Sequence, residues 1–81
     1  MPRYFFDAAN GSCHSDLEGA ELASTAEARS YAIRYAGQSL SDDPALLAGE
    51  EDFRVEVRDS ERLLLFTVTI FVTEAPAMMR A

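Results

Sequence analysis

The chain has 81 residues, of which 48% are hydrophobic and 26% charged, and this balance predicts one globular domain over residues 1–81 rather than a disordered segment or a fibre. Fourteen acidic residues outnumber seven arginines, and the net charge of -7 makes a phosphate-binding groove hard to build, so nucleic acid and anionic membrane surfaces are disfavoured as partners. The single cysteine, Cys13, cannot form an internal disulfide, which favours a reducing, cytoplasmic location.

The first predicted element is a β-hairpin that turns at Asn10 and Gly11. Asn-Gly between two β-prone runs is the strongest short signal for a two-residue type I′ turn, whereas a longer loop would shift the pairing by a residue or more. With the two-residue turn, Asp7 faces His14, and side-chain alternation places both on one face with Asp16. The opposite face is the better core and carries Tyr4, Phe6, Ala8, Cys13 and Leu17.

The firmest prediction is an α-helix from Ser24 to Leu40. Ser24 has the features of an N-cap, and Glu27, three residues later, completes a capping box. Small residues dominate the stripe that recurs at helical spacing, so this helix can lie close to a sheet. The stripe and its flanks are Ala28, Ala32, Ile33, Tyr35, Ala36 and Leu40. After the helix, Asp43 and Pro44 predict either a short helical turn or a loop.

Two further strands follow. In the segment DFRVEVRD, apolar and charged residues alternate, which indicates a half-buried antiparallel strand with Phe53, Val55 and Val57 on its inner face. The last strand, residues 63–72, is apolar on both faces and is too short for a membrane helix. One face must be buried and carries Leu64, Phe66, Val68, Ile70 and Val72. The other is too apolar for a fully exposed surface and carries Leu63, Leu65, Thr67, Thr69 and Phe71.

The elements together predict an α+β fold with the order strand-strand-helix-strand-strand. In this fold a four-stranded, mainly antiparallel sheet packs one face on one main helix. The other face of the sheet is half apolar because of the last strand, so we expect part of it to be covered. Residues 75–81 have no pattern and are predicted to fray.

The chain opens with Pro2, Arg3, Tyr4, Phe5 and Phe6. The further positions that carry a resemblance are Asn10, Gly11, Asp16, Gly19, Glu21, Leu22, Ala28, Ala32, Val55, Val57 and Asp59. On these residues the chain resembles a small proteobacterial family of unknown function whose members commonly open Pro-Arg-Tyr-Phe-Phe, and the likeness extends to about Val68. Members often have a histidine at the position of Asp7 and a glycine in the last hairpin turn, and this chain has neither. The resemblance implies no activity.

A weaker resemblance, to antitoxins of the HicB type, rests on a short sheet and an Ala-rich helix after a D-x-x-G turn. This resemblance implies a regulator whose acidic surface binds a basic protein partner. No DNA-binding segment is recognisable after the last strand, so only the general layout is shared.

Asp7, His14 and Asp16 are the candidate metal ligands. One imidazole nitrogen and two carboxylates suit a divalent transition metal, which would make the protein a small metal-dependent enzyme. The simpler interpretation is a cross-strand ion pair, because the spacing lacks a second histidine and a regular hairpin is open to water. Cys13 and His14 are neighbours that point to opposite faces, so Cys13 is predicted to be a small core residue. We therefore expect no cofactor and no catalytic residues.

The second apolar face of the last strand is the best interface candidate. We expect a non-catalytic protein-interaction module that self-associates as a homodimer. The predicted interface residues are Leu63, Leu65, Thr67, Thr69 and Phe71. A second recognition patch could comprise Tyr31, Arg34 and Tyr35, because aromatic residues and arginine are enriched at interfaces. An antitoxin-like regulator and a further protein partner stay open as alternatives.

Overall fold

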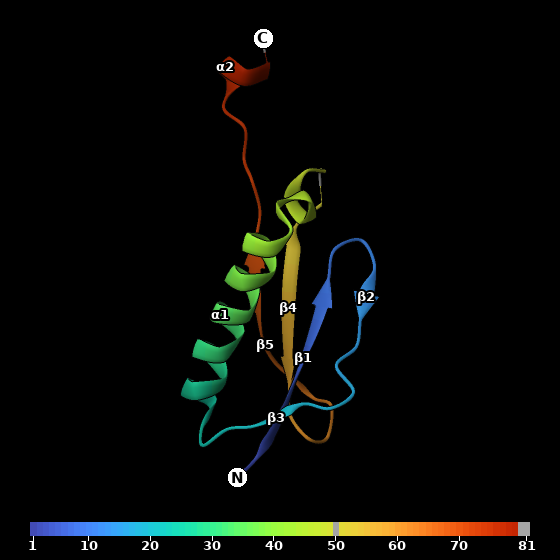
Figure 1. The fold of residues 1–81 in the computed structure, drawn as a ribbon, viewed down its shortest axis with the longest axis vertical. Helices are drawn as coiled ribbons and strands as arrows, with labels where there is room; N and C mark the ends of the chain where they lie inside the picture. Colours follow the sequence, from blue (N-terminus) through green and yellow to red (C-terminus); the bar gives the residue numbers. More distant parts are fainter. Residues whose placement is uncertain (50, 80–81) are drawn as a thin grey trace.

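The structure, a computed structural model, describes residues 1–49 and 51–79 and has an α+β fold (Figure 1). Its elements in chain order are β1 (Arg3–Ala9), β2 (Cys13–His14), β3 (Ala20–Glu21), α1 (Thr25–Asp42), the 3₁₀ turn η1 (Pro44–Leu47), β4 (Phe53–Arg58), β5 (Leu64–Ile70) and α2 (Pro76–Met79). The sheet has the order β2-β1-β4-β5, and β3 pairs with the other end of β1. The predicted fold class, one main helix on a mostly antiparallel sheet, is confirmed.

The core lies between α1 and the two central strands, β1 and β4. Side chains alternate between the two faces of a strand, so each of these strands turns one row of apolar side chains toward the helix. The pairs Phe6↔Val57 and Ala8↔Val55 align the two rows. Helix alanines let the two layers approach closely, as the small-residue stripe predicts. The buried cluster comprises Tyr4, Phe6, Ala28, Ala32, Ala36, Phe53, Val55 and Val57.

The start of α1 is confirmed at the residue level. The Ser24 hydroxyl accepts the Glu27 N–H at 3.2 Å, and the Glu27 carboxylate accepts the Ala23 N–H at 2.6 Å. The first bond satisfies a donor that a helix N-terminus leaves without an intrahelical partner, and the second ties the residue before the cap to the first turn. The helix continues two residues beyond the predicted end at Leu40, and the Asp43 side chain then caps η1 by accepting the Ala45 N–H at 3.2 Å.

The predicted register of the first hairpin is wrong by one residue. Ala9 pairs with Cys13 and Ala8 with His14, so residues 10–12 form the loop. A shift of one residue moves every side chain of the strand to the other face. His14 therefore shares the face of Ala8, toward α1, and Cys13 lies on the opposite face, where it is exposed rather than in the core.

The chain after β2 leaves the edge of β1 and returns to it at β3. Residues 15–19 form the connection, and Leu17, predicted for the core, is exposed. The return passes through Gly19, whose φ is +72°. A Cβ at this position would lie 2.7 Å from the Tyr4 carbonyl oxygen, so this close approach requires glycine.

A β-bulge changes the predicted faces of β5. Val57 pairs with Phe66, but Arg58 pairs with Leu64, so the row of side chains toward α1 ends at Phe66. Phe66, Val68 and Ile70 pack partly against the core, whereas Leu64 and Val72 are exposed. The prediction that this whole face is buried is therefore wrong.

The tail after β5 runs away from the body of the molecule in an extended conformation (Figure 1). Within residues 75–81, predicted to fray, Pro76–Met79 form one helical turn, α2, and residues 80–81 lie outside the described residues. The molecule is elongated as a result, with extents of 52 × 22 × 22 Å.

Candidate functional site

The structure brings two of the three predicted metal ligands together and separates the third: the Asp16 N–H donates to Asp7 Oδ1 at 2.9 Å, whereas His14 lies apart from both. Asp7 points to the face of the sheet away from α1, here called the open face, whereas His14 points to the face that α1 covers. The carboxylate of Asp7 instead accepts hydrogen bonds from Arg58 at 3.1 Å and Arg62 at 3.0 Å. Within residues 1–49 and 51–79, no group of three or more His, Cys, Asp and Glu side chains could hold a metal ion.

Asp16 closes the gap between β2 and β3. One of its oxygens accepts the N–H groups of Glu18 at 3.1 Å and Gly19 at 3.0 Å, and the other accepts the Phe6 N–H at 3.1 Å. Partial burial alone would raise the pKa of Asp16, but the three backbone donors and the charge of Arg62 outweigh it and hold the pKa below its ordinary value. The residue serves the edge of the sheet rather than a ligand.

Arg62 ties the β4–β5 turn to β1. Its backbone is left-handed, with φ at +66°, and its guanidinium lies 4.8 Å from the centroid of the Phe5 ring. The same guanidinium donates to both oxygens of Asp7, whose exposure is 3%. Two arginines thus compensate a buried carboxylate on the face of the sheet that points away from α1. Sequence reasoning singled out Asp7 but assigned it the wrong partner.

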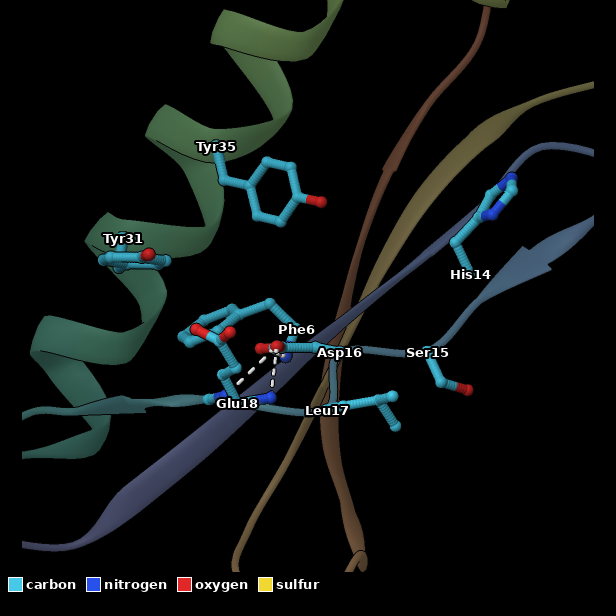
Figure 2. Close-up of a pocket in the computed structure, with 9 residues that line it drawn as sticks. Phe6, His14, Ser15, Asp16, Leu17, Glu18, Tyr31 and Tyr35 are labelled. Atoms are coloured by element: carbon cyan, nitrogen blue, oxygen red, sulfur yellow. Dashed lines mark hydrogen bonds between the residues drawn. The ribbon is translucent and has the colours of Figure 1, made fainter.

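A groove between α1 and the β2 side of the sheet is the first candidate binding surface (Figure 2). One hollow of the groove, of about 530 Å³, lies between the connection after β2 and two helix tyrosines, Tyr31 and Tyr35. The Tyr31 ring stacks at 4.5 Å on Phe6, which forms part of the wall. A neighbouring hollow of about 520 Å³ contains all three residues of the predicted helix patch, Tyr31, Arg34 and Tyr35. Tyr35 is 36% exposed and is therefore a groove residue, not a core residue.

The outer edge of β5 is the second candidate surface, and its hydrogen-bonding groups follow from the registers. The Phe6 N–H donates to Asp16, so the backbone groups of Phe6 point to the β2 side of β1. Neighbouring residues of a strand direct these groups to opposite sides. Those of Asp7 therefore point to β4, where they meet the groups of its partner Glu56.

The same alternation continues across β4. The backbone groups of Val55 point to β5, where Val55 pairs with Val68. The groups of Thr67 and Thr69 then point away from the sheet. Within the described part of the chain, no strand pairs with this outer edge of β5.

Exposed apolar side chains flank this edge at both ends. Leu63, Leu64 and Leu65 lie at the start of β5, and Phe71 and Val72 lie just after its end. No charged residue occurs in residues 63–73, although the chain as a whole carries -7. The five predicted interface residues are all exposed: Leu63, Leu65, Thr67, Thr69 and Phe71. Sequence reasoning missed Leu64 and Val72, because strict alternation placed them on the buried face.

No helix within residues 1–49 and 51–79 is both long and apolar enough to cross a membrane. A family model described as a domain of unknown function, DUF6894, matches residues 3–72. The matched segment begins with β1 and ends just after β5, so it includes both candidate surfaces and excludes α2. No curated protein and no solved structure matches the chain.

Proposed function

We propose that this chain, which belongs to the DUF6894 family of domains of unknown function, is a non-catalytic interaction module that forms a homodimer through the outer edge of β5. The observation that carries the proposal is an edge strand with outward backbone groups, no charged residue and exposed apolar flanks. Proteins usually protect such an edge with lysine, proline or a covering segment, because a bare edge is a template for pairing with another chain.

A second copy is the partner that fits the charge pattern. Two chains of -7 repel each other at most surfaces, but residues 63–73 bring no like charges together. Two identical strands can pair antiparallel about a two-fold axis, so the same patch serves both copies. This pairing would continue the sheet through β5 of one copy into β5 of the other.

The helix side of β5 supports the same arrangement. The row of β5 side chains that faces α1, which is Phe66, Val68 and Ile70, is only partly covered. The Arg29 guanidinium lies 5.5 Å from the centroid of the Phe66 ring, so the side of α1 that carries Arg29 lies above β5. Ile33 follows one turn later on the same side and is exposed. Edge pairing of two copies would bring both apolar rows, and the two Ile33 side chains, toward the partner.

The non-catalytic part of the proposal rests on the partners that already engage the candidate ligands. Asp7 is engaged by two arginines, Asp16 accepts three backbone N–H groups, and His14 lies on the opposite face from Asp7. Catalysis by a metal or by an acid and base pair needs such groups to converge on one substrate atom.

Replacing Thr67 by proline tests the dimer. Proline removes the outward N–H of Thr67 but none of the bonds to β4, and edge strands tolerate it for this reason. Light scattering over a dilution series should give the mass of two chains for the unaltered protein and of one chain for Thr67→Pro, with the same circular dichroism. Thr67→Ser keeps the N–H and should stay dimeric. A monomeric unaltered chain, or a dimeric Thr67→Pro variant, would overturn the proposal.

The alternative, a regulator of a basic protein partner, is supported by the groove. Glu18 and the helix tyrosines Tyr31 and Tyr35 share one of its hollows, and arginine both pairs with carboxylates and stacks on aromatic rings. Titration with an arginine-rich peptide should change the tyrosine fluorescence of the unaltered chain to saturation and that of Glu18→Gln much less. Equal binding by both proteins would count against the groove.

A further inference from the structure

Two groups of exposed apolar residues lie at opposite ends of β5. The hairpin cluster comprises Leu63, Leu64 and Leu65, and the tail cluster comprises Phe71 and Val72. A strand of seven residues is roughly 23 Å long, so the two clusters cannot cover each other within one copy. The tail that carries Phe71 leaves the body of the molecule (Figure 1).

Antiparallel pairing of two β5 strands brings these clusters together across the two-fold axis. The end of one β5 then lies beside the start of the other, and the tail cluster of each copy meets the hairpin cluster of its partner. The contact occurs twice, once on each side of the axis. A parallel arrangement would place like ends together and would leave the tails side by side.

The bulge places Leu64 of the hairpin cluster on the same face of the sheet as Phe71 of the tail cluster. Leu64 pairs with Arg58, and Arg58 bonds to Asp7 on the open face, so Leu64 lies on that face as well. Alternation beyond Thr69 puts Phe71 on the open face too, because these two residues are two positions apart. In a regular strand, Leu64 would point toward α1 and away from the Phe71 of the partner.

We infer that the dimer is completed by an exchange of tails, in which residues 71–73 continue β5 along the partner and Phe71 and Val72 pack on the partner's hairpin cluster. The inference rests on the proposed dimer and adds the segment that secures it. The segment lies almost entirely within the family match, which ends at Val72, whereas α2 lies outside it. The exchange therefore requires Phe71 and Val72 but not α2.

Sedimentation equilibrium on the full chain tests the exchange with a matched pair of variants. Phe71 and Met78 are both exposed apolar residues, at 67% and 63%, so neither substitution by serine removes a core contact. Phe71→Ser should raise the dimer dissociation constant on the order of 100-fold, because two rings lose their burial in each dimer. Met78→Ser, in α2, should change it less than threefold.

Cross-linking tests the contact itself. In a Cys13→Ser background, Leu65→Cys and Phe71→Cys chains are mixed and treated with a short bis-maleimide. The mixture should give a cross-linked dimer, whereas each variant alone should give little cross-linked product. Identical positions of the two copies lie about six residues apart along the paired strands, or roughly 20 Å, which is too far for a short cross-linker.

The outcomes separate the exchange from the dimer on which it rests. A chain that is monomeric, or a dimer that Thr67→Pro leaves intact, overturns both. A dimer that Thr67→Pro dissociates, but in which Phe71→Ser behaves like Met78→Ser and the mixture fails to cross-link, keeps edge pairing and overturns the exchange.

Discussion

The two edges of the sheet differ in how their backbone groups are satisfied. At the β1 edge, β2 and β3 pair with the two ends of the strand, and the Asp16 side chain accepts the Phe6 N–H between them. At the β5 edge, no strand within residues 1–49 and 51–79 pairs, and the strand itself carries no charged residue. The difference teaches that a polar side chain can close an edge inside one chain, whereas an edge without such a side chain leaves its backbone groups open to another strand.

Charged contacts follow the same division. Arg3 pairs with Glu21 at 2.9 Å on the β1 side, and Asp7 of β1 is bound by Arg58 of the neighbouring β4 and by Arg62 of the β4–β5 turn. Substitutions at the β1 edge should therefore change the free energy of unfolding of one chain. Substitutions at the β5 edge should change the mass in solution instead.

The largest effect is expected at Asp7. Asp7→Ala removes the buried carboxylate that Arg58 and Arg62 share, and only Arg58 keeps another carboxylate partner, Glu56. We expect the free energy of unfolding to fall by about 2–3 kcal/mol, below the cost at a fully buried pair because both arginines reach water. Urea denaturation followed by circular dichroism measures the loss. Asp52→Ala breaks a half-exposed pair with Arg54 and should cost about 0.5 kcal/mol or less. Equal losses in the two variants would contradict a stabilising role for the contacts of Arg58 and Arg62 with Asp7.

A smaller effect is expected at Asp16, and it depends on pH. The pKa of Asp16 is lowered in the folded chain, so its ionised form stabilises the fold above the unfolded pKa of about 3.9 and loses this effect as the pH falls through the folded pKa. Asp16→Asn should cost about 1–2 kcal/mol at pH 7. The gap between the two proteins should shrink as urea titrations are repeated from pH 5 to pH 2. A constant gap would mean that the charge of Asp16 does not stabilise the edge.

The smallest effect on unfolding is expected at Thr69, on the β5 edge. Lysine is a common guard of bare edge strands, so Thr69→Lys should give a monomer whose free energy of unfolding changes by less than about 0.5 kcal/mol. Unfolding is measured below the dimer dissociation constant, because association adds apparent stability by mass action. Thr69→Val keeps the branched shape and should stay dimeric. A dimeric Thr69→Lys protein would show that the two edges do not differ in this way.

The sequence predicts those parts of the fold whose signals are local. The Ser24 cap with Glu27 fixes the start of α1, and the alternation of Phe53, Val55 and Val57 fixes the inner face of β4. The family resemblance agrees with the match over residues 3–72. For the helix start and the β4 face, a few neighbouring residues carry the whole signal.

The parts that were predicted wrongly depend on distant contacts. The loop after Ala9 has one residue more than the Asn-Gly signal indicates, and that residue moves His14 to the helix side of the sheet. The bulge beside Arg58 accompanies a turn whose Arg62 binds Asp7 across 55 positions of sequence, and no local pattern reports such a bond. The groove depends in the same way on two segments distant in sequence, α1 and the connection after β2. The sequence indicated the excess apolar surface of β5. It did not indicate the unpaired backbone N–H and C=O groups of β5, because these depend on the sheet order that places β5 at an edge.

The pairing of β1 with β4 has a consequence for the order in which the protein folds. Asp7 and Arg58, which bond across these strands, lie 51 residues apart in the chain. The central pair must therefore close a loop that contains the whole of α1, and the entropy of such closure slows folding. During synthesis α1 emerges before β4, without the central strand pair to cover its alanine stripe. The pairing of β4 with β1 should thus set the folding rate. Because β5 follows β4 by only a few residues, its apolar edge becomes exposed at almost the same time as the domain folds and can first meet a second copy.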